Sequence, residues 1–128
     1  MTASISDFRP KFVSNNKIKK HGDDGLTIEL IQNPDVLKTV SKLKTKEDQK
    51  IVGFCAETEN LIENAIKKIN SKNLDSIVAN DVSRKDIGFN VDYNEVTVIN
   101  KNGEQIKIEK DTKNNIARKV LNIVFNKQ

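Results

Sequence analysis

The chain has 128 residues and a formal net charge of +4, with 36% hydrophobic and 31% charged residues. This composition predicts one folded domain with a modest core and argues against a disordered chain. The small positive excess suits a phosphorylated small ligand. Without an arginine-rich run or an aromatic stripe, it gives no support for binding to nucleic acid.

The usage of cysteine and histidine narrows the class further. Cys55 is the single cysteine and His21 the single histidine, so an internal disulfide is excluded and a zinc site is not expected. No apolar run is long enough to span a bilayer, and no basic segment followed by an apolar one marks a signal peptide. We therefore expect a cytoplasmic protein without a membrane partner.

The first quarter of the chain predicts β-structure. A short strand is expected at 2–6, ending before Asp7. Segments 16–20 and 26–32 flank a turn rich in Gly and Asp, which predicts a β-hairpin. In the second of these segments apolar residues alternate with polar ones, so one face of the hairpin should be apolar.

The sequence Asn-Pro-Asp that follows marks the start of a helix over 33–43. Asn33 can cap it, and Pro34 suits the first helical position because the N–H that proline lacks would be unpaired there. The unpaired N–H groups and the positive dipole end of such a helix also favour a phosphate group. A plain helix start remains the simpler interpretation.

The middle of the chain predicts strand, helix and strand. The run 51–57 is almost entirely apolar, which is typical of a strand buried on both faces of a parallel sheet. A helix is expected over 58–72, with Thr58 as its cap and apolar residues at helical spacing. A second buried strand is expected at 75–81.

The last third predicts a second hairpin, 95–100 with 104–110, because an Asn-Gly pair joins the two segments. An amphipathic helix over 111–126 closes the chain. Buried strands that alternate with helices indicate an α/β domain, and we expect a three-layer, Rossmann-like, mostly parallel sheet with helices on both faces.

Candidate anion-binding residues are found at two places. Lys68 and Lys72 are four residues apart on one side of the predicted helix, so their ammonium groups can converge on one anion. Lys17, Lys19 and Lys20 crowd the predicted hairpin. Each set is also explained by solvation, as ordinary helix surface or as an edge that discourages strand pairing. The residues alone support an α/β domain with an anion site and leave these alternatives open.

Several stretches occur together in one order: "SISDFRPK", "NKIKK", "LTIELIQNPDV", "VGFCAETENLIENAIKKINSKNLDSIVANDVS" and "IGFNVDYNEVTVI". In combination they resemble phosphopantothenoylcysteine synthetase, the CTP-dependent ligase of coenzyme A biosynthesis. The similarity runs almost from end to end of the chain. It implies that residues 1–128 are the C-terminal part of such a synthetase domain, with a protruding dimerisation hairpin.

The resemblance also implies roles for individual residues. Lys17 matches the first lysine of the Lys-Ile-Lys-Lys motif and would be the main catalytic cation, countering charge at the reacting phosphorus. The positions that match the CTP site are Met1, Thr2, Ala3, Asp7, Lys17, Pro34, Asp35, Val36, Leu37, Phe54, Lys68 and Lys72. The three lysines among them, Lys17, Lys68 and Lys72, are expected to surround one phosphoanhydride.

The implied substrates are CTP, 4′-phosphopantothenate and cysteine, with Mg²⁺ accompanying the triphosphate and no dedicated metal ligands. A homodimer through the hairpin at 16–32 is implied, and FMN is not expected on this chain. The first half of the family's domain, with its glycine-rich strand-loop, has no counterpart here. The alternative is therefore a catalytically incompetent fragment that acts only as a dimerisation or binding module.

Overall fold

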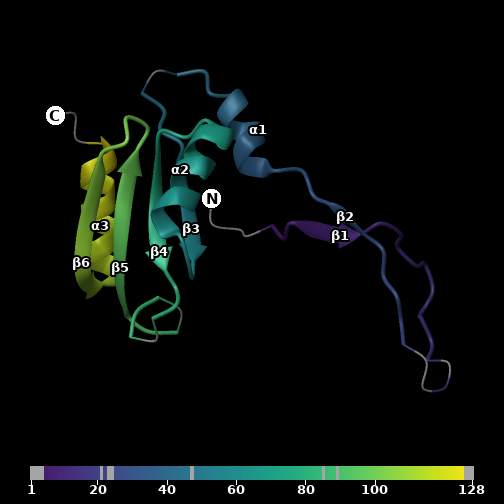
Figure 1. Ribbon diagram of the computed structural model, residues 1–128. Coiled ribbons are helices and arrows are strands. Elements are labelled where there is room, and N and C mark those ends of the chain that lie inside the picture. Colours follow the sequence, from purple (N-terminus) through teal and green to yellow (C-terminus); the bar gives the residue numbers. More distant parts are fainter. Residues whose placement is uncertain are drawn as a thin grey trace.

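The computed structural model describes residues 5–20, 22, 25–46, 48–84, 86–88 and 90–125. A four-stranded sheet with helices on both faces carries a long arm formed by residues before 35 (Figure 1). The strands are β1 (Phe8–Pro10), β2 (Leu30–Gln32), β3 (Val52–Glu57), β4 (Ser76–Asp81), β5 (Tyr93–Asn100) and β6 (Gln105–Thr112). The helices are α1 (Val36–Lys42), α2 (Leu61–Lys72) and α3 (Lys113–Phe125).

The sheet is mixed, so the expectation of a mostly parallel sheet is wrong in this detail. Its order is β3-β4-β5-β6, with β3 and β4 parallel and the other two pairs antiparallel. A parallel pair needs a crossover, and α2 supplies one between β3 and β4. The Asn102-Gly103 turn joins β5 to β6 directly, as predicted, and a tight turn produces an antiparallel pair.

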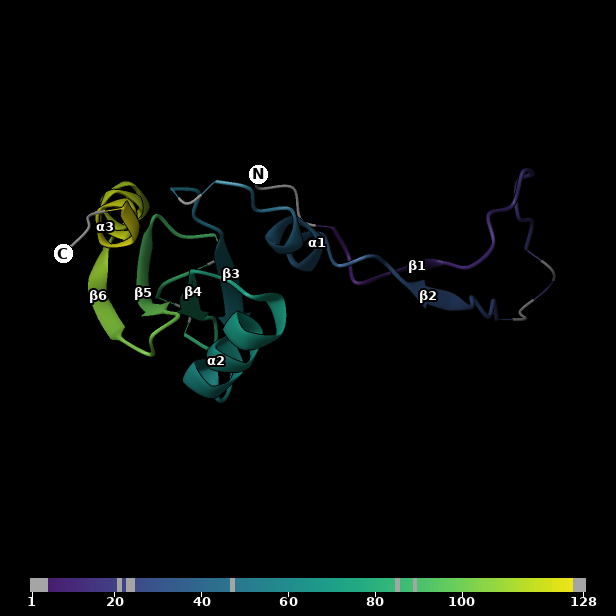
Figure 2. The ribbon, with the colours of Figure 1, turned by 90° about the horizontal axis from the view of Figure 1, so that it is seen from above.

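Helices cover both faces of the sheet, which confirms the α/β layered class. Figure 2 shows α2 on one side of the strands and α3 on the other. Strand alternation explains this arrangement, because Ile77 and Ala79 of β4 pack with α2 while Val78 packs with α3. No helix in the described part of the chain has the length and apolarity that crossing a bilayer requires.

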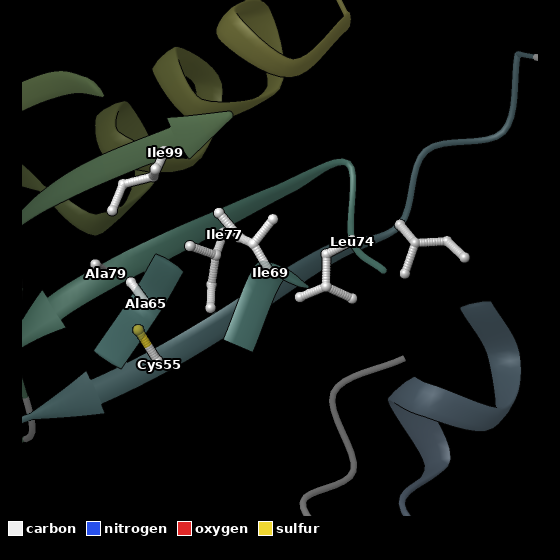
Figure 3. Close-up of a cluster of buried hydrophobic side chains, with 8 residues drawn as sticks. Cys55, Ala65, Ile69, Leu74, Ile77, Ala79 and Ile99 are labelled. Carbon is white, nitrogen blue, oxygen red and sulfur yellow. The ribbon is translucent and has the colours of Figure 1, made fainter. Parts of the chain in front are cut away.

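The larger core cluster lies between α2 and the strands β3, β4 and β5 (Figure 3). Its buried members are Ile51, Cys55, Ala65, Ile69, Leu74, Ile77, Ala79 and Ile99. Cys55 packs here as a small apolar residue, and burial raises the pKa of its thiol. Leu37 and Val40 of α1 pack against the same cluster and attach that short helix to the body.

Gly53 lets these elements approach closely. A Cβ at this position would lie 2.7 Å from Cδ1 of Leu74 and 3.4 Å from Cδ2 of Leu37. Leu74 is fully buried, so it has little room to move away. The absence of a side chain at Gly53 therefore allows Leu37 of α1 and Leu74, which follows α2, to pack on this strand.

Two helices begin at residues other than those predicted. Asp35, not Asn33, caps α1, because its carboxylate accepts a hydrogen bond from the backbone N–H of Lys38 at 3.0 Å. Asn33 instead binds Ser6 and Arg9 of the arm. Helix α2 starts after Asn60, whose backbone is left-handed (φ 51°) and whose side chain makes no capping hydrogen bond, so Thr58 is not the cap.

The strands of the arm also differ from the prediction. Residues 2–4 lie outside the described residues, and Ile5 and Ser6 are not in a strand. Strand β1 forms later, at 8–10, and pairs antiparallel with β2. The segment 16–20 is not a strand, so the predicted pairing of 16–20 with 26–32 is wrong.

The arm exposes most of its apolar side chains. Val13 is 86% and Phe12 74% exposed, and Ile18, Leu26 and Ile28 are also exposed. Two strands alone cannot bury an apolar face, and the body lies to one side of the arm (Figure 1). The alternating pattern that predicts a half-buried hairpin therefore has no core among the described residues to pack on.

Replacing Gly53 tests the close packing of β3. We expect Gly53→Ala to lower the free energy of unfolding by about 1–3 kcal/mol, because the new methyl group overlaps buried Leu74. Urea unfolding followed by circular dichroism measures this change. Gly25→Ala is the control, since nothing lies within 4 Å of its added Cβ. Equal stability of the two variants would contradict the packing argument.

Candidate functional site

The start of α1 and the end of α2 meet at an ion pair. Nζ of Lys72 lies 3.0 Å from Oδ2 of Asp35, and both side chains are partly exposed. The capping hydrogen bond from Lys38 lowers the pKa of Asp35, and Lys72 adds to this effect. Two predicted CTP-site residues that are distant in the sequence are therefore neighbours.

Lys68 lies one turn earlier on the same side of α2. Its ammonium group binds the carboxylate of Glu57 at the end of β3, and this hydrogen bond lowers the pKa of Glu57. Asn64 donates a second hydrogen bond to Glu57 at 3.3 Å. Both lysines thus share one helix face, as predicted, and each is paired with a carboxylate of the chain.

The residues at the start of α1, next to the ion pair of Asp35 and Lys72, differ in their exposure. Pro34 and Asp35 are exposed, whereas Val36 and Leu37 are partly buried. Because the carboxylate of Asp35 occupies the N–H of Lys38, the phosphate site expected at this helix start already holds a negative group. Lys68 and Lys72, not the helix N-terminus, are therefore the groups here that can attract an anion.

Phe54 lies on the other face of β3. Its neighbours Gly53 and Cys55 point toward α2, so strand alternation directs Phe54 to the side of the sheet that carries α3. The ring is 76% exposed. The structure does not bring it onto the face with Lys68 and Lys72.

The predicted residues of the arm are separated from the body. Lys17 belongs to an exposed segment in the distal part of the arm (Figure 1). Asp7 is exposed beside β1, and its backbone carbonyl accepts a hydrogen bond from the N–H of Asn33 at 2.8 Å. Met1, Thr2 and Ala3 lie outside the described residues. Within one chain, the expected gathering of Lys17 with Lys68 and Lys72 does not occur.

Asn80, near the end of β4, is a candidate functional residue that the sequence analysis did not name. Oδ1 of Asn80 is buried and accepts no hydrogen bond from the described residues. Nδ2 of Asn80 lies 3.7 Å from the Cβ position of Gly88, in the loop that follows β4. A buried acceptor without a donor is costly, so this atom marks a place where a ligand can contribute one. In the sequence, the position of Asn80 beside Asp81 at the end of a predicted strand could have identified it as a candidate.

The described residues offer no metal site. They contain no group of three or more His, Cys, Asp or Glu side chains placed to hold an ion. A Mg²⁺ ion that accompanies a nucleotide would therefore depend mainly on phosphate and water oxygens.

A depression of about 580 Å³ lies between the start of β4, the β5–β6 turn and the end of α3. Its lining includes Lys50, Ser76, Asn100, Lys101 and Asn122. None of the predicted CTP-site residues contributes to it. It is therefore separate from the residues that meet at α1 and α2.

Comparison with known proteins establishes the family. Residues 1–127 match the family described as "DFP: DNA/pantothenate metabolism flavoprotein C-terminal domain", and the chain belongs to this family. The "Coenzyme A biosynthesis bifunctional protein CoaBC" of Bacillus subtilis (strain 168) is 41% identical over 120 residues, covering 94% of this chain and 29% of that protein. The protein of the same description from Borreliella burgdorferi is 38% identical over 125 residues, covering 96% and 30%.

A solved structure agrees with this assignment. The chain is similar to the "C-terminal Domain of Coenzyme A biosynthesis bifunctional protein CoaBC", with a TM-score of 0.70 and 37% identity. The match covers 97% of this chain and 50% of that one. The chain therefore spans half of that domain structure and less than a third of the two full-length relatives.

Acid titration tests the ion pair at the α1 start. Because the folded pKa of Asp35 is lowered, its contribution to stability is present above its ordinary pKa of about 3.9 and is lost as pH falls through the folded value. Asp35→Asn keeps a capping side chain without the charge. We expect its stability deficit, measured by urea unfolding, to shrink below about pH 4.

Lys72→Gln is the matched variant, because it removes the ion pair and leaves the capping carboxylate in place. It should retain part of the pH dependence. A deficit of Asp35→Asn that stays constant with pH would show that the charge of this carboxylate does not stabilise the fold.

Proposed function

We propose that this chain supplies the CTP-binding and dimerising half of a phosphopantothenoylcysteine synthetase. In that reaction a carboxylate oxygen of 4′-phosphopantothenate attacks the α-phosphorus of CTP and pyrophosphate leaves. The amine of cysteine then attacks the acyl carbon, and CMP leaves as the amide forms. Family membership supports this proposal, as do the names of the CoaBC relatives, which assign them to coenzyme A biosynthesis.

The observation that carries the proposal is the meeting of α1 and α2. Asp35 and Lys72 are 37 residues apart in sequence and lie 3.0 Å apart, with Lys68 one turn away on the same face. The paired carboxylates hold both lysine side chains in fixed positions. Phosphate oxygens reaching this surface would find two ordered ammonium groups, which costs less entropy than ordering exposed side chains.

A second copy of the chain would complete the site. Lys17 is on an arm whose apolar residues, among them Phe12, Val13 and Ile18, are exposed. Pairing with the arm of another copy would bury these side chains and could bring Lys17 to the nucleotide of the partner. Its ammonium group would then stabilise the negative charge that develops on the oxygens of the reacting α-phosphate in the first step.

The described residues do not form a metal site, so we assign no step to Mg²⁺.

The unsatisfied Oδ1 of Asn80 lies at the carboxyl end of β4, where ligands of open α/β sheets bind. It would accept a hydrogen bond from the bound substrate.

The second candidate is a binding module without chemistry. It is favoured by the pairing of Lys68 and Lys72 with carboxylates and by the distance of the Lys17 segment from the body. In this case the arm would associate two copies and CTP would not be turned over. Sedimentation combined with pyrophosphate release, measured with the missing half of the domain restored, separates a dimer that releases pyrophosphate from one that does not.

Calorimetry with CTP and ATP tests the proposed site. We expect CTP to bind more tightly than ATP, and Lys72→Gln to weaken CTP binding roughly tenfold. Lys67→Gln is the control, since Lys67 is on the same helix but pairs with Glu63 at the surface. Equal affinity for the two nucleotides, or no binding with the domain half restored, would contradict the proposal.

Lys17→Gln tests the catalytic role of the arm in the completed domain. We expect turnover to fall by roughly 100-fold, as for loss of one group that stabilises transition-state charge. Thermal unfolding should be unchanged, because Lys17 is exposed. Lys20→Gln removes the same charge from the same segment and should retain activity. Normal turnover with a lowered unfolding temperature would assign Lys17 a structural role instead.

A further inference from the structure

The described residues of the connection between β4 and β5 turn back at the carboxyl end of β4 (Figure 1). Ile87 is 2% exposed, so its burial attaches the connection to the body. Gly88 follows with a positive φ of 90°, and its N–H donates a hydrogen bond to the carbonyl oxygen of Tyr93 at 3.2 Å. Residues with a side chain rarely adopt this backbone, so Gly88 allows the chain to return tightly to β5.

Charged side chains tie this connection to strands β5 and β6. Arg84 donates two hydrogen bonds to the carboxylate of Asp86, from Nε to Oδ1 at 3.0 Å and from Nη2 to Oδ2 at 2.8 Å. Its Nη1 donates to Oε1 of Glu95 on β5 at 2.9 Å. Nζ of Lys110 on β6 donates to Oδ2 of Asp86 at 2.8 Å. These four residues, Arg84, Asp86, Glu95 and Lys110, are named the β4–β5 clamp.

The β4–β5 clamp differs from an isolated ion pair at the surface. Single exposed pairs contribute little to stability, whereas a bidentate arginine or a network of several charges holds a fixed geometry more effectively. The clamp has both features, because Asp86 binds Arg84 through two oxygens and Lys110 through one of them. The hydrogen bonds from Arg84, and then that from Lys110, hold the pKa of Asp86 well below its usual range. The carboxylate therefore remains charged at neutral pH.

The segment held by the clamp lies against the side chain of Asn80. A Cβ at Gly88 would be 3.7 Å from Nδ2 of Asn80 and 3.9 Å from Cγ1 of Val82. Oδ1 of the same amide is buried and accepts no hydrogen bond from the described residues. Because no donor fixes this oxygen, packing against Gly88 and Val82 contributes to holding the amide in its orientation.

We propose that Asp86 is a positioning residue that acts through Asn80. By binding Arg84 and Lys110, Asp86 holds Gly88 against the amide of Asn80 and so keeps Oδ1 available to the bound substrate. The inference rests on the proposed function, in which this oxygen accepts a hydrogen bond from substrate. An acceptor that is already ordered binds its donor more tightly, because less entropy is lost on binding.

A double-mutant cycle in the completed domain tests whether Asp86 acts through Asn80. We expect Asp86→Ala to raise the KM of one of the three substrates roughly tenfold with little change in kcat, because a disordered acceptor weakens binding of the ground state. Asn80→Ala should raise the same KM, and adding Asp86→Ala to it should have no further effect. Asp86→Glu keeps the charge and should recover part of the loss.

The control removes a surface carboxylate from another ion pair. Glu63 binds Lys67 on α2, and both side chains are largely exposed. Glu63→Ala should therefore leave every KM unchanged. Circular dichroism checks that each variant folds, and Asp86→Asn replaces Asp86→Ala throughout if the alanine variant does not fold.

Heteronuclear NMR of the chain without substrate gives an independent readout. The side-chain NH₂ signals of Asn80 and the backbone N–H signal of Gly88 should shift or broaden in Asp86→Ala and stay in place in Glu63→Ala. Three results overturn the proposal: unchanged Asn80 signals, an unchanged KM for every substrate, or additive effects in the double variant. If the completed domain forms no product, the proposed function fails, and the NMR comparison still decides whether Asp86 positions Asn80.

Discussion

The close contact at Gly53 is the constraint on which the body of the molecule depends. Leu74 of the α2–β4 connection and Leu37 of α1 both pack over the position where another residue would have a side chain. This contact joins the parallel β3–β4 pair to both helices of one layer. It also sets the distance between the start of α1 and the end of α2, and so permits the ion pair between Asp35 and Lys72.

The molecule buries apolar surface unevenly, and this unevenness has a physical meaning. The body contains two well-packed clusters on opposite sides of the sheet. By contrast, the arm, strand β3 and helix α3 expose large apolar side chains, among them Phe12, Phe54 and Leu121. Contiguous exposed apolar surface is typical of sites that bind another polypeptide.

The candidate site is also divided between the body and the arm. Its body component is ordered by paired charges, Lys72 with Asp35 and Lys68 with Glu57, which an incoming phosphate would have to share. Its arm component, Lys17, is carried on an element that leaves the body (Figure 1). Under the proposed function, such a site would couple nucleotide chemistry to assembly, because its cations would come together only when chains associate.

Local pattern was sufficient for the elements of the body. The apolar run at 51–57, the helical spacing in 58–72 and the Asn-Gly turn each predicted the element that formed, since each depends on neighbouring residues. The shared face of Lys68 and Lys72 followed from helical geometry. The cap of α1 was decided by one local and one distant contact: Asp35 accepts a hydrogen bond from the N–H of Lys38, and Asn33 binds Arg9 of the arm. Four features depended on contacts between distant segments. They are the strand pairing in the arm, the antiparallel pairing of β4 with β5, the face occupied by Phe54 and the unsatisfied Asn80. Only the tertiary structure decided these, because a periodic pattern specifies which residues share a face but not what that face will meet.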